Sequence, residues 1–138
     1  MQRFVDMAVI VSYIPTPEGR AALDFALRTA RERGDSLRIA DGSGGRHRLE
    51  HEEGQVPFDR VGELVEPTGV PYEVLSPAMA GVPMDEVVEA AVDDPTADVI
   101  VIGIRRRSAV GKFLLGSSAQ RLILDAECPV TVVKTTAR

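Results

Sequence analysis

A cationic segment that ends in a glycine and two serines contains the residue types best suited to chemistry. Its cations are Arg105, Arg106, Arg107 and Lys112, and it closes on Gly116, Ser117 and Ser118. A helix is predicted to begin at Ser117, because this hydroxyl can cap the first turn while Gln120 reaches back to the cap. The free N–H groups of a helix N-terminus attract anions, and a neighbouring glycine lets a phosphate approach the backbone. These residues therefore predict a phosphate site.

The elements on either side place this segment at the edge of a sheet. Residues 99–102 form a continuous apolar run, which is typical of a strand covered on both faces by helices. Gly103 is predicted to end that strand, and residues 129–133 are predicted to form the next one. The phosphate site is thus expected at the carboxyl end of a central parallel strand, where sheets of this kind bind ligands.

The rest of the sequence alternates between strand and helix patterns. Strands are predicted over residues 4–11, 37–40 and 72–75, and helices over residues 17–33, 57–68 and 84–92. Thr16 is expected to cap the first helix and Gly34 to end it. Alternation of this kind predicts right-handed crossovers and a parallel sheet. We therefore predict an α/β fold, a doubly wound sandwich of five parallel strands with four helices on both faces.

Length and composition predict one domain over residues 1–138. The fraction of hydrophobic residues is 44% and that of charged residues 27%, values typical of a globular protein. The longest apolar runs have strand length, so no membrane span is expected. The N-terminal residues have the pattern of a first strand and lack a cleavage site for secretion. The single cysteine, Cys128, fits a reducing compartment, so we expect a cytoplasmic protein.

The distribution of charge narrows the class of ligand. The net charge is −5, yet residues 99–124 contain five cations and no acid, so the remainder carries −10. General nucleic-acid binding needs an extended basic face, which this pattern excludes. One small anionic ligand fits better, and the alternative is an arginine-rich loop that is merely solvated.

Other chemistries find little support. Ala109–Lys112 suggests a P-loop, but that motif needs glycine where Arg106 stands and a hydroxyl residue where Phe113 stands. His47 and His51 are four residues apart, a spacing that chelates metals on a helix. They fall in a polar, glycine-rich stretch, residues 41–56, which predicts a flexible loop. No base is therefore placed beside a nucleophile, and we predict neither a resident metal nor an enzyme, with at most weak nucleotide hydrolysis.

The stretch from residue 98 to residue 134 resembles the universal stress proteins (the UspA-like family). Their signature is Gly, two residues, Gly, nine residues, and then Gly followed by Ser or Thr. Gly103, Gly116 and Ser117 stand at matching positions, whereas Arg106 replaces the second glycine. The continuation GSSAQRLI and the later ECPVTVVK are similar to the family's last helix and last strand. In the order of its elements, the resemblance extends over nearly the whole chain.

The resemblance implies a strand order of 3-2-1-4-5 and a cytoplasmic role in stress response or signalling. It also implies ATP or another phosphate ligand in the crevice after the fourth strand, with Mg²⁺ only as the companion of a nucleotide. The implied phosphate site contains Gly103, Arg105, Arg106, Lys112, Gly116, Ser117 and Ser118. Arg106 would either shield the crevice or supply a charge. The family's binders have an Asp after the first strand, whereas residues 11–15 contain no acid. The alternative is a member of the same fold that binds no nucleotide and acts as a dimeric protein-interaction module.

The last strand bears on assembly. It is expected at a sheet edge, where Pro129 is tolerated as a first residue. An apolar edge invites pairing with another copy, and members of the family commonly dimerise through this strand. We therefore expect a homodimer with Val130 and Val132 at the interface.

Overall fold

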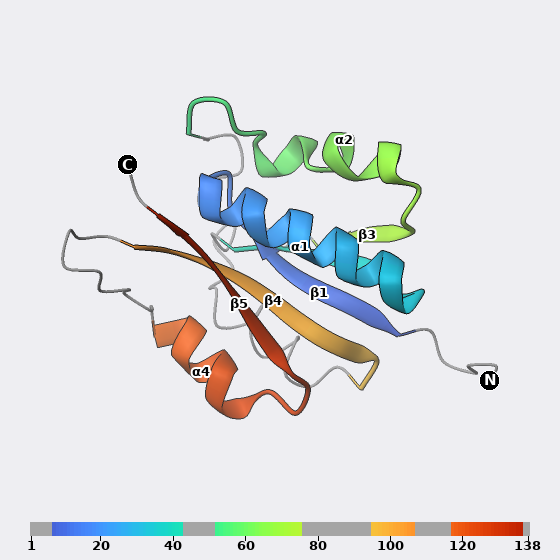
Figure 1. The fold of residues 1–138 in the computed structure, drawn as a ribbon, viewed down its shortest axis with the longest axis vertical. Coiled ribbons are helices and arrows are strands. Elements are labelled where there is room, and N and C mark those ends of the chain that lie inside the picture. The colour runs from blue at the N-terminus through green and yellow to red at the C-terminus, as the bar shows by residue number, and fades with distance from the viewer. Residues whose placement is uncertain (1–6, 43–51, 76–94, 107–116, 137–138) are drawn as a thin grey trace.

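Five parallel strands form a single sheet in the order β3-β2-β1-β4-β5 (Figure 1). The computed structural model describes residues 7–42, 52–75, 95–106 and 117–136. The strands are β1 (Ala8–Tyr13), β2 (Ser36–Asp41), β3 (Tyr72–Leu75), β4 (Ala97–Arg106) and β5 (Val130–Thr136). The predicted α/β class, the parallel sheet and the strand order implied by the family resemblance are confirmed.

Helices lie on both faces of the sheet (Figure 1). Helix α1 (Pro17–Arg33) packs on one face, and α4 (Ser117–Asp125) packs on the other. Because successive strand residues point to opposite faces, Val9 and Val11 join the cluster under α1, while Ile10 joins the cluster under α4 around Leu122. The predicted helix over residues 84–92 lies outside the described residues.

The first helix begins and ends where the sequence predicts. The Thr16 hydroxyl accepts a hydrogen bond from the Gly19 amide at 3.1 Å, which satisfies one free N–H group of the first turn. Gly34 has a φ of 71°, and its amide donates to the carbonyl groups of Ala30 and Arg31. Residues other than glycine are strained in this left-handed conformation. Gly34 can therefore end α1 with little loss of conformational energy.

The predicted helix over residues 57–68 is instead three short pieces. They are η1 (Phe58–Arg60), α2 (Gly62–Val65) and η2 (Glu66–Thr68). The tight hydrogen bonds from Val61 to Phe58 and from Leu64 to Val61 are of the 3₁₀ type. Pro67 has no N–H group to continue an α-helix into the last piece. The prediction of helical structure over these residues is confirmed, but the prediction of one continuous helix was wrong.

Strand β4 is longer than predicted. It runs through Gly103 to Arg106 because β5 pairs with it over the whole extension, from Gly103 with Val133 to Arg106 with Thr136. The prediction that Gly103 ends the strand, and that Arg105 and Arg106 belong to a loop, was therefore wrong.

None of the helices in the described ranges has the length and apolar character needed to span a bilayer.

The boundaries near the predicted flexible loop also shift. β1 continues to Tyr13, and β2 continues to Asp41, whose residue exposure is only 1%. Asp41 is therefore part of the sheet and not of the loop predicted over residues 41–56. Of that stretch, residues 43–51 lie outside the described part of the chain. Glu52 donates its amide to the Pro15 carbonyl, so the end of the stretch is attached to the turn after β1.

Candidate ligand site at the carboxyl edge of the sheet

The pairing between β1 and β4, in the middle of the sheet, stops before the carboxyl end of β4. β1 leads through α1 to β2 on one side, whereas β4 leads to β5 on the other. Paired residues of β1 and β4 extend only to Val11 and Val101, yet β4 continues beside β5 to Arg106. Within the described residues, the last part of β4 thus has a strand partner on one side alone. This is the winding reversal at which doubly wound sheets bind ligands.

Most of the residues predicted to bind phosphate lie at this edge. Arg105 and Arg106 are the last residues of β4, in register with Thr135 and Thr136. Ser117 and Ser118 are the first residues of α4, which confirms the predicted start of that helix. Because α4 connects the carboxyl end of β4 to the start of β5, its N-terminus lies toward the carboxyl edge. Lys112 and Gly116 lie outside the described residues.

Gly103 has a packing role on the α1 face of the sheet. A Cβ atom at this position would lie 2.2 Å from the Glu18 carbonyl oxygen and 3.4 Å from the Ala22 Cβ. Glu18 is in the first turn of α1, so the missing side chain lets that turn rest directly on β4. The glycine is therefore required by the contact between helix and strand, whatever the ligand.

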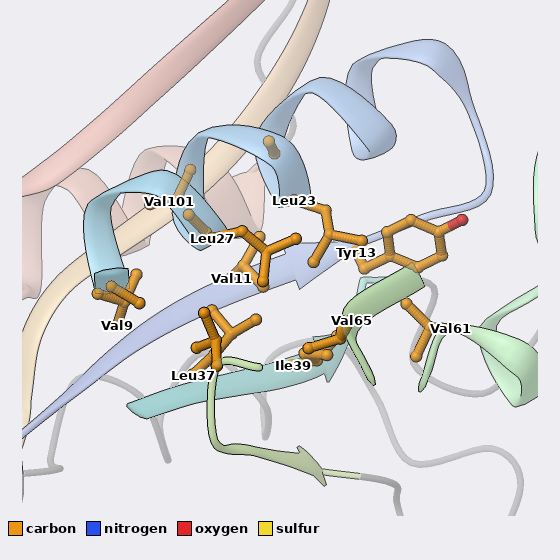
Figure 2. Close-up of a cluster of buried hydrophobic side chains, with 14 of the residues drawn as sticks. Val9, Val11, Tyr13, Leu23, Leu27, Leu37, Ile39, Val61, Val65 and Val101 are labelled. Carbon is orange, nitrogen blue, oxygen red and sulfur yellow. The ribbon is translucent and has the colours of Figure 1, made fainter. Parts of the chain in front are cut away.

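Tyr13 forms the β1 side of the edge. Its residue exposure is 0%, and its hydroxyl donates to the Val56 carbonyl at 2.5 Å. Figure 2 shows the ring at the end of a row of buried side chains with Val11 and Leu23. Burial raises the pKa of Tyr13, an effect that the nearby Arg20 cation opposes. The phenol is accordingly neutral at physiological pH and available as a donor.

Sequence reasoning missed one acid at this edge. Asp41 ends β2 in register with Tyr13 and is buried, so the carboxyl edge does contain a carboxylate although β1 ends without one. Its signal was the alternation of Leu37 and Ile39, which places Asp41 next in the same row. The first strand was predicted to end at Val11, two residues before Tyr13, and Tyr13 was given no role. Its contact with Val56 spans 43 positions, a distance that no local pattern reveals.

The described residues contain no group of three or more His, Cys, Asp or Glu side chains that could hold a metal ion. His47 and His51, the pair weighed as ligands in the sequence, lie outside the described ranges. By residue type, the chain at this edge has two arginines at the end of β4 and two serines at the start of α4, together with the first backbone amides of that helix. Such groups bind anions.

The fold defines a doubly wound α/β domain with a winding reversal between β1 and β4. The model of the universal stress protein family matches residues 7–134, and the chain belongs to the universal stress protein family. The family to which the sequence bears a resemblance is thereby confirmed.

Individual relatives agree with this assignment. A universal stress protein of Mycolicibacterium smegmatis is 37% identical over 132 residues, which cover 91% of this chain and 96% of the relative. A solved universal stress protein of Archaeoglobus fulgidus is similar with a TM-score of 0.69 and 29% identity, covering 95% of this chain and all of that one. The structure of the universal stress protein from the same organism in complex with dAMP has a TM-score of 0.64 and 25% identity, covering 96% and 100%.

Proposed function

We propose that this universal stress protein binds ATP or a related adenine nucleotide at the carboxyl edge of β1 and β4. The observation that carries the proposal is the extension of β4, which brings Arg105 and Arg106 to the edge where α4 begins. The relative in complex with dAMP supports a nucleotide as the ligand. The protein would act in the cytoplasm as a nucleotide-linked stress or signalling protein, with at most slow hydrolysis.

The chemistry of the edge favours the phosphate end of a nucleotide on the β4 side. Guanidinium groups match phosphate oxygens with paired hydrogen bonds. The N-terminus of α4 adds free amide groups and the positive end of the helix dipole, and Ser117 and Ser118 stand there. Mg²⁺ would enter only with the nucleotide.

A second candidate is a member of the fold that binds no nucleotide and acts through protein contacts. Three observations favour it: Arg106 replaces a signature glycine, β1 ends without an acid, and Gly103 has a packing reason of its own. The two candidates differ in what the purified protein carries and binds.

The test is calorimetric titration of the protein with ATP, together with mass spectrometry of any nucleotide released by acid. We expect micromolar binding and a loss of at least about tenfold in Arg106→Glu, because hydrogen bonds to charged groups are strong. Arg28→Glu on α1 makes the same charge change and is the control, since Arg28 stacks over the Phe25 ring 5.5 Å away. If wild-type protein neither carries nucleotide nor binds millimolar ATP, the second candidate replaces the first.

We also infer a homodimer that forms through β5. β5 is an edge strand of the sheet, as its order requires, and an exposed strand edge is a template for pairing. Val130 and Val132 are half-buried and pack against the cluster that contains Leu122, which leaves only part of each side chain for a partner.

Charge on the β5 edge is expected to separate the two copies. Thr131→Lys places a cation on the edge at a half-buried polar position, so the mass measured by light scattering should halve while the unfolding temperature changes little. Val132→Asp should also dissociate the dimer, but it places a charge against the core and lowers stability as well. A wild-type protein that is monomeric at micromolar concentration would contradict the proposal.

A further inference from the structure

We propose that Tyr13 is a positioning residue, whose buried hydroxyl holds residues 52–57 at the carboxyl end of β1 as a wall of the nucleotide site. The inference rests on the proposed function, since it assigns a role within the same site. It concerns the β1 side, where this chain lacks the acid that the family resemblance leads one to expect.

Two hydrogen bonds tie this segment to β1 and the turn after it. The Tyr13 hydroxyl donates to the Val56 carbonyl, and the Glu52 amide donates to the Pro15 carbonyl at 3.0 Å. Within the segment, the Gln55 amide donates to the Glu52 carbonyl at 2.9 Å. The segment is thus attached at Glu52 and at Val56, and the bond between Gln55 and Glu52 closes a turn between these two points.

The core anchors the segment from the other direction. Phe58, directly after it, is buried in the same cluster as Tyr13, and Val61 lies beside the Tyr13 ring (Figure 2). A phenol in this place fills the core with its ring and reaches a backbone carbonyl with its hydroxyl. Because Tyr13 is in register with Asp41, the hydrogen bond between Tyr13 and Val56 also lies next to the buried end of β2.

The wall and the end of β4 differ in charge. Glu52 and Glu53 are exposed on the segment, whereas β4 ends with Arg105 and Arg106. A nucleotide has an anionic end and a nucleoside end that carries hydroxyl and amino donors. Charge complementarity therefore orients the phosphates toward β4 and the nucleoside toward the segment at β1.

The test is Tyr13→Phe, which keeps the ring and removes the hydroxyl. Hydrogen exchange at the Glu52 and Gln55 amides should become at least about tenfold faster, and the Kd for ATP should rise about five- to tenfold, which is the loss of one hydrogen bond. The Kd for inorganic triphosphate should not change, because that ligand has no nucleoside. A merely structural role would leave the ratio of the two affinities unaltered.

Two further variants sharpen the result. Tyr72→Phe is the matched control, because the Tyr72 hydroxyl donates a 3.1 Å hydrogen bond to the Glu66 carboxylate and makes no bond to residues 52–57. This variant should change neither hydrogen exchange at residues 52–57 nor the affinity for ATP. Glu52→Pro removes the amide that bonds to Pro15 and should weaken ATP binding without touching Tyr13.

Each failure has its own signature. Unchanged hydrogen exchange in Tyr13→Phe would contradict the claim that the Tyr13 hydroxyl holds residues 52–57 in place. Faster exchange with unchanged ATP affinity would contradict the claim that these residues form one side of the nucleotide site. No ATP binding by the wild-type protein would overturn the proposed function and the wall together, while the exchange result would still decide whether Tyr13 holds the segment.

Discussion

Replacing Gly103 with alanine is expected to destabilise the protein by about 3 kcal/mol or more, at the upper end of the cost of overpacking. The added Cβ would lie 2.2 Å from the Glu18 carbonyl oxygen, a backbone atom in the first turn of α1. Relief requires α1 to move away from β4, which would loosen the cluster formed by Val101 and Ala22. Urea unfolding followed by circular dichroism measures the loss.

Gly62→Ala is the matched control. The nearest atom to its added Cβ is the Tyr72 hydroxyl oxygen at 2.8 Å, the far end of a half-buried side chain that can rotate. Alanine also gains up to about 1 kcal/mol over glycine inside a helix. The control should therefore be neutral or slightly stabilising. Equal effects at both positions would contradict the packing role of Gly103, and a stable Gly103→Ala protein that loses only ATP binding would make Gly103 a ligand contact instead.

Leu23→Ala should cost about 2–5 kcal/mol of the free energy of unfolding, the range for a buried leucine whose cavity cannot collapse. Leu23 has an exposure of 0% and lies in α1 against Val11 and Tyr13 (Figure 2). Its side chain fills the space between α1 and the central strand, so its loss removes contacts on both elements. Thermal and urea unfolding give the same quantity by two routes.

Leu124→Ala makes the identical change on α4 at a side of the helix that faces outward. The exposure of Leu124 is 81%, so its truncation leaves no cavity, and any difference in helix propensity is shared with Leu23→Ala. We expect a change within about 0.5 kcal/mol. A large loss at Leu124 would mean that a partner covers this face, and a small loss at Leu23 would mean that the core under α1 repacks.

Local signals in the sequence were sufficient where the chain's own neighbours decide the structure. The two ends of α1, at Thr16 and Gly34, were predicted correctly because helix capping depends on residues within one turn. β4 was predicted too short because its extension depends on β5, a partner later in the chain that no local pattern around Gly103 contains. A glycine inside a strand is costly in isolation, and here close contact with α1 selects it.

The same distinction between local signals and distant partners decided which parts of the candidate site could be predicted. The start of α4 at Ser117 was predicted because the signal for it, a serine followed three residues later by Gln120, is local in sequence. The predicted capping bonds themselves stay a prediction. Tyr13 and Asp41 were not found, since their roles arise only when β1, β2 and residues 52–57 come together. The strand order followed from the family resemblance, because spacing alone does not choose between the two edges of a growing sheet.

The central pairing of Ile10 with Ile100 has a consequence for synthesis on the ribosome. β1, α1, β2 and β3 emerge first, but one edge of β1 has to wait for a strand from the far end of the domain. Contacts between such distant residues form slowly, and an unpaired central strand is prone to association in the meantime. A nascent chain that stops before β4 would hold only half of the proposed ligand edge. If the proposed function holds, the ability to bind nucleotide would report that translation has passed that strand.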